Sequence, residues 1–251
     1  GQAYLYWGNP DLYYVKLNEN MISYNKAVGI VKVPLTVEGF GPRSNTDRAT
    51  SYEEGPWFFK RNSLYYMLYP GGPLPEFFAY STSVNPTGPW EYRGKFMAAI
   101  ADKGAFTNHP GYIDFKGKSY LFYHNAGLSG GGGYKRSVCV EEFAFNENGT
   151  IPVIAPTKTG VVKSASNLNP YQLNQAEMIA WEEGVETEKC SRGGMNVCNI
   201  ENGDYIKVRS LDFGTAGAAT FSATVSSGTN GGTIELRLNS TIGTLIGTLP
   251  V

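Results

Sequence analysis

The sequence has few of the side chains that hold metals through sulfur or imidazole. Its 251 residues include three cysteines and two histidines, with neither a CxxC pair nor the Cys/His spacing of a zinc site. Cys139 lies in an apolar, strand-like run and is expected to be a buried thiol, whereas Cys190 and Cys198 lie close enough in sequence to bridge a hairpin. A zinc-centred fold is therefore excluded.

Charge and long apolar runs are also scarce. Charged residues make up 17% of the chain and the formal net charge is -1, which gives no electrostatic basis for binding nucleic acid or an anionic membrane. No apolar run reaches the roughly 18 residues of a membrane span. The glycines Gly130–Gly133 lack the spacing of a phosphate-binding loop. We expect them to form a flexible loop at the rim of a substrate site.

Aromatic residues and glycine are abundant instead, and they form a repeat. The chain has 31 Gly, 17 Tyr and 13 Phe, a composition that favours short strands and tight turns over helices. A turn followed by an aromatic strand recurs around Tyr4, Tyr65 and Tyr120, at intervals of 61 and 55 residues. Repeats of about this length, each built from four short strands, are typical of β-propeller blades.

The second and third copies share a polar residue at an equivalent place. Glu54 stands eight residues before the turn at Asn62, and His109 stands eight residues before the turn at Gly117. The first strand of each blade lines the central channel of a propeller, so Glu54 and His109 are expected to converge on one cavity. Glu53 is expected to point the other way, because adjacent strand residues face opposite sides.

The pattern of strands changes after about residue 160. Alternating segments at 204–209, 219–225 and 233–238, separated by Gly-rich turns, predict a β-sandwich. We predict an all-β chain with a partial propeller over residues 1–160, a linker over 161–168 and a partial sandwich over 169–251. Three blades cannot close a propeller, so the N-terminal end is expected to be truncated. The chain stops at Val251 in what reads as another strand, so the C-terminal end is expected to be truncated too.

A carboxylic acid at a channel mouth is what glycoside hydrolysis requires. One carboxyl group protonates the leaving oxygen while a second activates water or attacks directly. Glu54 fits the first role, although by itself it is one acidic loop residue among many. His109 could equally be a buried structural histidine, His124 is expected to be structural, and Arg136 could hold a sugar hydroxyl or a carboxylate through its planar fork.

With these residues in place, the first part of the chain resembles glycoside hydrolase family 43. The likeness is carried by four segments, Tyr52–Trp57, Tyr80–Ser83 with Pro86–Trp90, Thr107–Gly111 and Gly133–Glu142. It implies a five-bladed propeller, of which the three C-terminal blades are present, and an inverting mechanism with an Asp base, an orienting Asp and a Glu acid. On this likeness Glu54 is the acid, His109 is the central histidine that contacts calcium through water, and Arg136 is an active-site arginine. The two aspartates would precede Gly1, so we expect the chain to be inactive alone.

The second part resembles a family 6 carbohydrate-binding module, a jelly-roll sandwich. The likeness is carried by four segments, Gln175–Glu177, Gly203–Ile206, Val208–Gly214 and Gly232–Arg237. It implies a structural calcium site to which Gln175 and Glu177 contribute from a strand, in keeping with the preference of calcium for oxygen ligands.

The leading hypothesis is a secreted enzyme that removes α-L-arabinofuranosyl side chains from plant-wall arabinoxylan. A β-xylosidase of the same family, acting on xylo-oligosaccharides, shares the propeller and its motifs. A non-catalytic polysaccharide-binding protein is the alternative from another class. Each of the three predicts a polysaccharide partner, no organic cofactor and no membrane or nucleic-acid partner.

Overall fold

The computed structural model describes residues 1–161 and 167–251, in two compact units, Gly1–Ala165 and Ser166–Val251. The predicted linker at 161–168 lies mostly outside the described residues, and the predicted domain boundaries stay a prediction. The described residues are nearly all in strands and loops, as predicted for an all-β chain, and contain one short helix, α1 (Val37–Phe40), and one 3-10 turn, η1 (Asp102–Gly104). Neither helical segment of the described chain is long and apolar enough to cross a membrane.

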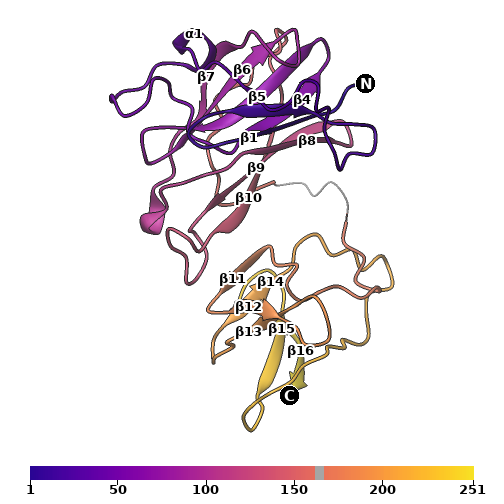
Figure 1. Cartoon of the computed structure of the whole chain (residues 1–251). Helices are drawn as coiled ribbons and strands as arrows, with labels where there is room; N and C mark the ends of the chain where they lie inside the picture. Colours follow the sequence, from indigo (N-terminus) through magenta and orange to yellow (C-terminus); the bar gives the residue numbers. More distant parts are fainter. Residues whose placement is uncertain (162–166) are drawn as a thin grey trace. The chain divides into compact units, whose positions relative to one another are not determined.

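The first unit consists of three consecutive antiparallel sheets (Figure 1). The first sheet contains β1 (Tyr4–Trp7), β2 (Tyr13–Lys16) and β3 (Val31–Lys32). The middle sheet contains β4 (Trp57–Arg61), β5 (Leu64–Gly71), β6 (Phe77–Ser83) and β7 (Glu91–Met97). The third contains β8 (Gly111–Phe115), β9 (Lys118–Asn125) and β10 (Ser137–Phe143). The first unit thus has the successive sheets that the repeat predicted.

The two central strands of the middle sheet, β5 and β6, are buried on both faces because most of their odd- and even-numbered side chains are apolar. Successive side chains of a strand point to opposite faces. Tyr66 and Leu68 of β5 belong to a core shared with the third sheet, while Met67 and Tyr69 belong to a core shared with the first sheet. The alternation of β6 follows the same rule. Three sheets therefore pack face to face, as blades do.

Two short hairpins set the level of the strand ends. Two-residue turns join β4 to β5 and β8 to β9. Asn62 in the first turn, and Lys116 and Gly117 in the second, have φ angles of 53°, 49° and 76°, the left-handed conformation of tight hairpin turns. The predicted turns at Asn62 and Gly117 are confirmed. Because the second turn begins at Lys116, Glu54 stands eight residues before its turn and His109 seven before its own, a difference of one position.

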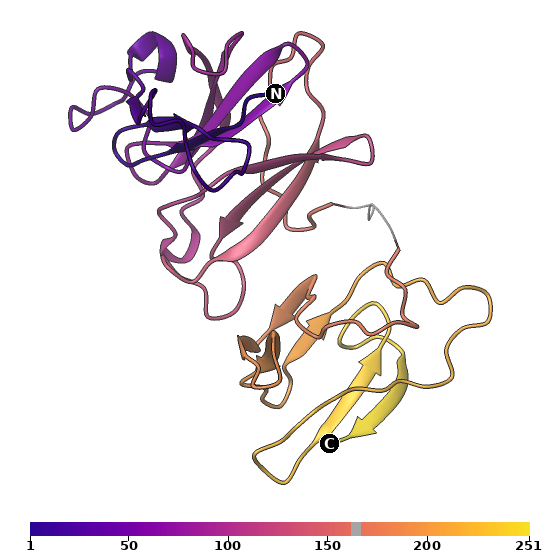
Figure 2. The ribbon, with the colours of Figure 1, turned by 45° about the vertical axis from the view of Figure 1, so that its right-hand side comes forward.

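The second unit contains three two-stranded antiparallel sheets (Figure 2). They pair β11 (Trp181–Glu183) with β14 (Tyr205–Lys207), β12 (Glu186–Lys189) with β13 (Met195–Cys198), and β15 (Thr233–Arg237) with β16 (Leu245–Pro250). Strands are confirmed at two of the three predicted segments. The prediction at 219–225 is wrong, since these exposed residues have no partner strand, and alternation alone does not make a strand.

Two smaller predictions for this unit are also wrong. Gln175–Glu177 is a turn rather than a strand, and Met178 N–H donates to the Gln175 carbonyl at 3.1 Å. Cys190 and Cys198 are free thiols. The register of the β12–β13 hairpin places Cys198 opposite Glu186, four residues before Cys190, so the hairpin separates the two cysteines instead of joining them.

Candidate active site

Glu54 lies where the chain leaves its pairing with β5. Gly72 N–H donates to the Ser51 carbonyl at 2.8 Å, and Glu53 N–H donates to the Pro70 carbonyl at 3.0 Å, so residues 51–53 run beside the end of β5. Gly55 then turns the chain with a φ of +51°, a conformation that favours glycine. The Glu54 carboxyl is thereby fixed at the end of the middle sheet, with 26% of the side chain exposed.

His109 meets Glu54 from the third sheet. Its Nε2 atom lies 3.3 Å from Glu54 Oε1, and 41% of the His109 side chain is exposed. The imidazole packs against Gly55, because a Cβ at that position would lie 3.0 Å from His109 Nδ1. The structure therefore brings together the two residues that the repeat singled out.

Glu53 points away from this pair into a buried ion cluster. Its carboxylate oxygens lie 2.6 Å from Arg43 Nη1 and 2.6 Å from Arg48 Nη1, and the Glu53 and Arg43 side chains are 6% and 3% exposed. Arg48 also donates to the Glu53 carbonyl at 2.9 Å. Because each carboxylate oxygen has a cationic partner, Glu53 serves as an anchor for the segment that carries Glu54.

Asn9 is a site residue that the sequence reasoning missed. It follows β1 in the turn to β2, and its Nδ2 donates to Glu54 Oε2 at 3.1 Å. Tyr52 OH donates to the Gly8 carbonyl at 2.8 Å and holds this turn. The repeat contained a signal, since Asn9 stands five residues after Tyr4 as Asn125 stands five residues after Tyr120.

Glu76 is the second missed residue, and it is more deeply buried than Glu54. Only 3% of it is exposed, and its Oε2 accepts the Asn108 N–H at 2.7 Å. Burial raises the pKa of Glu76 to about 7, with a further increase from the nearby charge of Glu54. Ligand atoms of Glu54, Glu76 and His109 all lie within 4.8 Å of one another. An acidic residue opening the apolar strand β6 was the available sequence signal.

Arg136 and His124 border the same group. Arg136 is exposed, and its Nη2 donates to Thr107 Oγ1 at 2.8 Å, which ties the start of β10 to the segment leading to His109. The His124 ring lies 6.0 Å from the His109 ring. Burial, followed by the charges of Arg136 and His109, lowers the pKa of His124 to about 4. His124 is therefore neutral at neutral pH.

The two predicted calcium positions differ in the donors they offer. Beside His109, the Glu76 carboxylate supplies an oxygen of the kind calcium prefers. In the second unit, Gln175 and Glu177 supply two oxygen donors, and no cluster of three acidic, His or Cys side chains in the described residues includes Glu177. Calcium takes about six to eight oxygens, backbone carbonyls among them, and the calcium site of the second unit stays a prediction.

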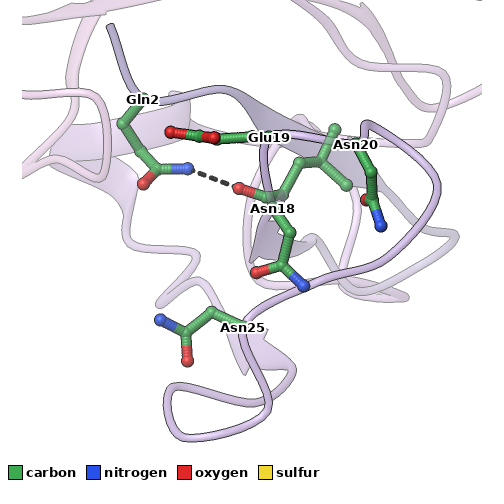
Figure 3. Close-up of a pocket in the computed structure, with 6 residues that line it drawn as sticks. Gln2, Asn18, Glu19, Asn20 and Asn25 are labelled. Carbon is green, nitrogen blue, oxygen red and sulfur yellow. Dashed lines mark hydrogen bonds between the residues drawn. The ribbon is translucent and has the colours of Figure 1, made fainter.

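A surface pocket of about 480 Å³ is drawn in Figure 3. It lies where β1 begins and β2 ends, whereas Asn9 lies in the turn at the other end of this hairpin. Its wall consists of Gln2, Leu17, Asn18, Glu19, Asn20 and Asn25. Several of its side-chain amides already form hydrogen bonds with backbone groups; for example, Gln2 Nε2 donates to the Leu17 carbonyl at 2.8 Å. This pocket is separate from the Glu54 group.

Comparison with known families assigns both units. Residues 1–151 match the model for glycosyl hydrolases family 43. The chain belongs to this family. Residues 175–251 match the model for carbohydrate binding module (family 6), so the second unit is such a module. Glu54, Glu76, His109 and Arg136 all lie inside the family 43 match, whereas Gln175 and Glu177 lie in the module.

Three similar proteins show how far the likeness extends. An arabinoxylan arabinofuranohydrolase of Paenibacillus polymyxa is 39% identical over 200 residues, which cover 73% of this chain and 30% of that protein. A xylosidase/arabinosidase of Bacteroides ovatus is 31% identical over 139 residues, which cover 55% of this chain and 41% of that protein. A family 43 arabinoxylan arabinofuranohydrolase from Bacillus subtilis, solved in complex with cellotetraose, matches all of this chain and 55% of its own, at 30% identity and a TM-score of 0.73.

The predicted fold is confirmed by these matches. A family 43 propeller is followed by a family 6 β-sandwich module, and the three sheets of the first unit are blades of the propeller. The total of five blades stays a prediction. The chain spans about half the length, or less, of the proteins it matches.

Proposed function

We propose that the protein is a glycoside hydrolase that releases α-L-arabinofuranosyl side chains from arabinoxylan, with Glu54 as the general acid. The contact between Glu54 and His109, 3.3 Å apart at the ends of adjacent blades, is the observation that carries the proposal. Both residues lie in the segments that match family 43. The similarity to two arabinoxylan arabinofuranohydrolases supports the substrate.

In the proposed reaction, Glu54 transfers its proton to the glycosidic oxygen as the bond from that oxygen to the anomeric carbon breaks. The electron pair of the broken bond stays on the oxygen, and the xylan backbone leaves as an alcohol. In an inverting reaction, water attacks the anomeric carbon from the opposite face, and a carboxylate base takes its proton. Glu54 is left as a carboxylate, beside the N–H donor of Asn9.

His109 and Arg136 are proposed to bind substrate around the acid. The half-exposed imidazole of His109 presents ring nitrogen atoms to the site, and the exposed guanidinium of Arg136 presents donors for sugar hydroxyls. A calcium ion contacting His109 through water, with Glu76 as an oxygen donor, would supply positive charge beside the acid. The family 6 module is proposed to hold the enzyme on plant-wall polysaccharide, which implies a secreted protein.

Hydrolysis of wheat arabinoxylan by the natural full-length protein that carries this sequence tests the proposal. We expect release of free arabinose, and a loss of about 100-fold or more in kcat for Glu54→Gln, since general acid catalysis contributes about 10²–10⁴-fold. Asp11→Asn is the matched control, because Asp11 contacts Lys32 at the surface and lies two residues from Asn9. Full activity of Glu54→Gln would refute the role of Glu54 and favour the non-catalytic binding protein.

Release of β-linked xylose is the second candidate function. The similarity to the xylosidase/arabinosidase of Bacteroides ovatus favours it. Xylo-oligosaccharides given to the same protein separate the two candidates. Xylose released without arabinose would assign the chain to the β-xylosidases.

A further inference from the structure

The Asn9 side chain connects the buried ion cluster to Glu54. Its Nδ2 donates to Glu54 Oε2 at 3.1 Å, while its Oδ1 accepts from Arg48 Nη2 at 3.3 Å. A guanidinium has donors and no acceptor, so the amide oxygen of Asn9 must face Arg48 and the amide nitrogen must face Glu54. The orientation of the amide is therefore determined by its charged neighbour.

This connection is rigid at its distant end. Arg48 Nη1 is held by the Glu53 carboxylate at 2.6 Å and by the Glu53 carbonyl at 2.9 Å. The second oxygen of Glu53 is held by Arg43, whose side chain is 3% exposed. On the other side of Asn9, the Tyr52 hydroxyl fixes the Gly8 carbonyl. Asn9 is thus held on both sides by contacts that do not involve Glu54.

The hydrogen bond from Asn9 makes the two oxygens of the Glu54 carboxyl group inequivalent. In a protonated carboxyl group one oxygen bears the hydrogen and the other accepts hydrogen bonds. Oε2 accepts from Asn9, and Oε1 faces His109 Nε2 at 3.3 Å. Oε1 is the oxygen left to carry the proton.

We infer that Asn9 is a positioning residue for proton donation: it occupies Oε2 of Glu54 and so presents Oε1 as the oxygen that protonates the leaving group. This inference rests on the proposed function, in which Glu54 is the general acid. If Asn9 has a positioning role, replacing it should lower kcat most for substrates whose leaving group must be protonated as it departs. Misplacement of a catalytic group by about 1 Å can cost about 100-fold.

Asn9→Asp in the natural full-length protein tests the inference. The aspartate keeps the shape of the side chain and its contact with Arg48, and it replaces the N–H donor with an oxygen. On arabinoxylan, where the leaving group is an alkoxide, we expect kcat to fall about 10- to 100-fold with KM unchanged within about 2-fold. On 4-nitrophenyl α-L-arabinofuranoside, where the leaving phenolate needs little protonation, we expect a fall of less than about 3-fold.

Two further variants keep the test decisive. Asn9→Ala in a Glu54→Gln background should cause no additional loss, because the residue that Asn9 positions has already been removed. Asp11→Asn, in the same turn, should leave the ratio of the two activities unchanged. Thermal unfolding of each variant shows whether its fold is retained.

The outcomes separate the inference from the function on which it rests. Equal losses on both substrates in Asn9→Asp, or no loss on either, would overturn the role of Asn9 while Glu54→Gln remained inactive on arabinoxylan. Full activity of Glu54→Gln would overturn the proposed function itself, and the inference with it.

Discussion

Replacing the buried acid Glu76 with glutamine should change how the stability of the first unit depends on pH. Burial raises the pKa of Glu76 from 4.5 to about 7, so the folded protein holds a proton there that the unfolded chain has lost. The folded state binds more protons between these two values, and its free energy of unfolding falls as the pH rises through that range. Glutamine is neutral throughout and removes this dependence.

The size of the effect follows from the two pKa values. A difference of one pKa unit corresponds to about 1.4 kcal/mol, so a carboxylate buried at pH 8 costs up to about 3 kcal/mol relative to its protonated form. Water penetration and local relaxation reduce such costs, and we expect about 2 kcal/mol. Glu76→Gln keeps a hydrogen-bond acceptor for the Asn108 N–H, because the amide oxygen of glutamine takes the place of Oε2.

Urea unfolding of the calcium-free parent and of calcium-free Glu76→Gln at pH 5 and pH 8, with a chelator present, measures this effect. Three of the four tryptophans, Trp7, Trp57 and Trp90, lie in the first unit and only Trp181 lies in the second, so tryptophan fluorescence reports mainly on the unfolding of the first unit. Relative to the parent, Glu76→Gln should gain about 2 kcal/mol more at pH 8 than at pH 5. The comparison between the two pH values cancels any constant effect of the new amide. A difference that is the same at both pH values would refute the raised pKa.

Two further substitutions test the residues that support the site. Gly55→Ala places a Cβ 3.0 Å from His109 Nδ1 at a φ of +51°, so it should cost about 1–2 kcal/mol in urea unfolding and lower kcat. Gly29→Ala is the control, because it has a φ of +71° and open space around the new Cβ; it should cost a similar amount of stability and leave kcat unchanged. An equal kcat in the two variants would contradict the packing of Gly55 against His109. Glu53→Gln breaks the buried ion cluster with Arg43 and Arg48 and should cost about 3–5 kcal/mol in urea unfolding. Asp11→Asn removes an exposed ion pair of 2.8 Å with Lys32, and solvent screening should make its cost much smaller. Similar losses of stability in both variants would argue against a special role for burial.

The meeting of Glu54 and His109 could be read from the sequence because it depends on hairpin geometry. Glu54 stands eight residues before the first residue of its two-residue turn and His109 stands seven before the first residue of its own, and strands of equal length bring them within one residue of the same level. The face-to-face packing of neighbouring blades then brings those ends together. A repeat predicts such a contact because every copy applies the same local rule.

The second unit shows where local rules were insufficient. Residues 219–225 alternate between apolar and polar side chains as a strand does, yet the structure pairs them with no other segment. Strand formation requires a partner as well as a pattern, and the pattern carries no information about the partner. The same limit applies to Cys190 and Cys198, whose separation depends on the register of β12 and β13.

Asn9 and Glu76 were missed because their roles arise between blades and not within one. Asn9 reaches Glu54 across 45 positions of sequence. Glu76 immediately precedes β6, a strand whose start was not aligned with any other copy. The repeat identifies what neighbouring blades have in common, whereas an asymmetric site is built from what differs between them. The acid is held by an amide from the blade before it and an imidazole from the blade after it. Alignment of the copies can therefore locate the centre of such a site, and only the contacts between sheets can assign its parts.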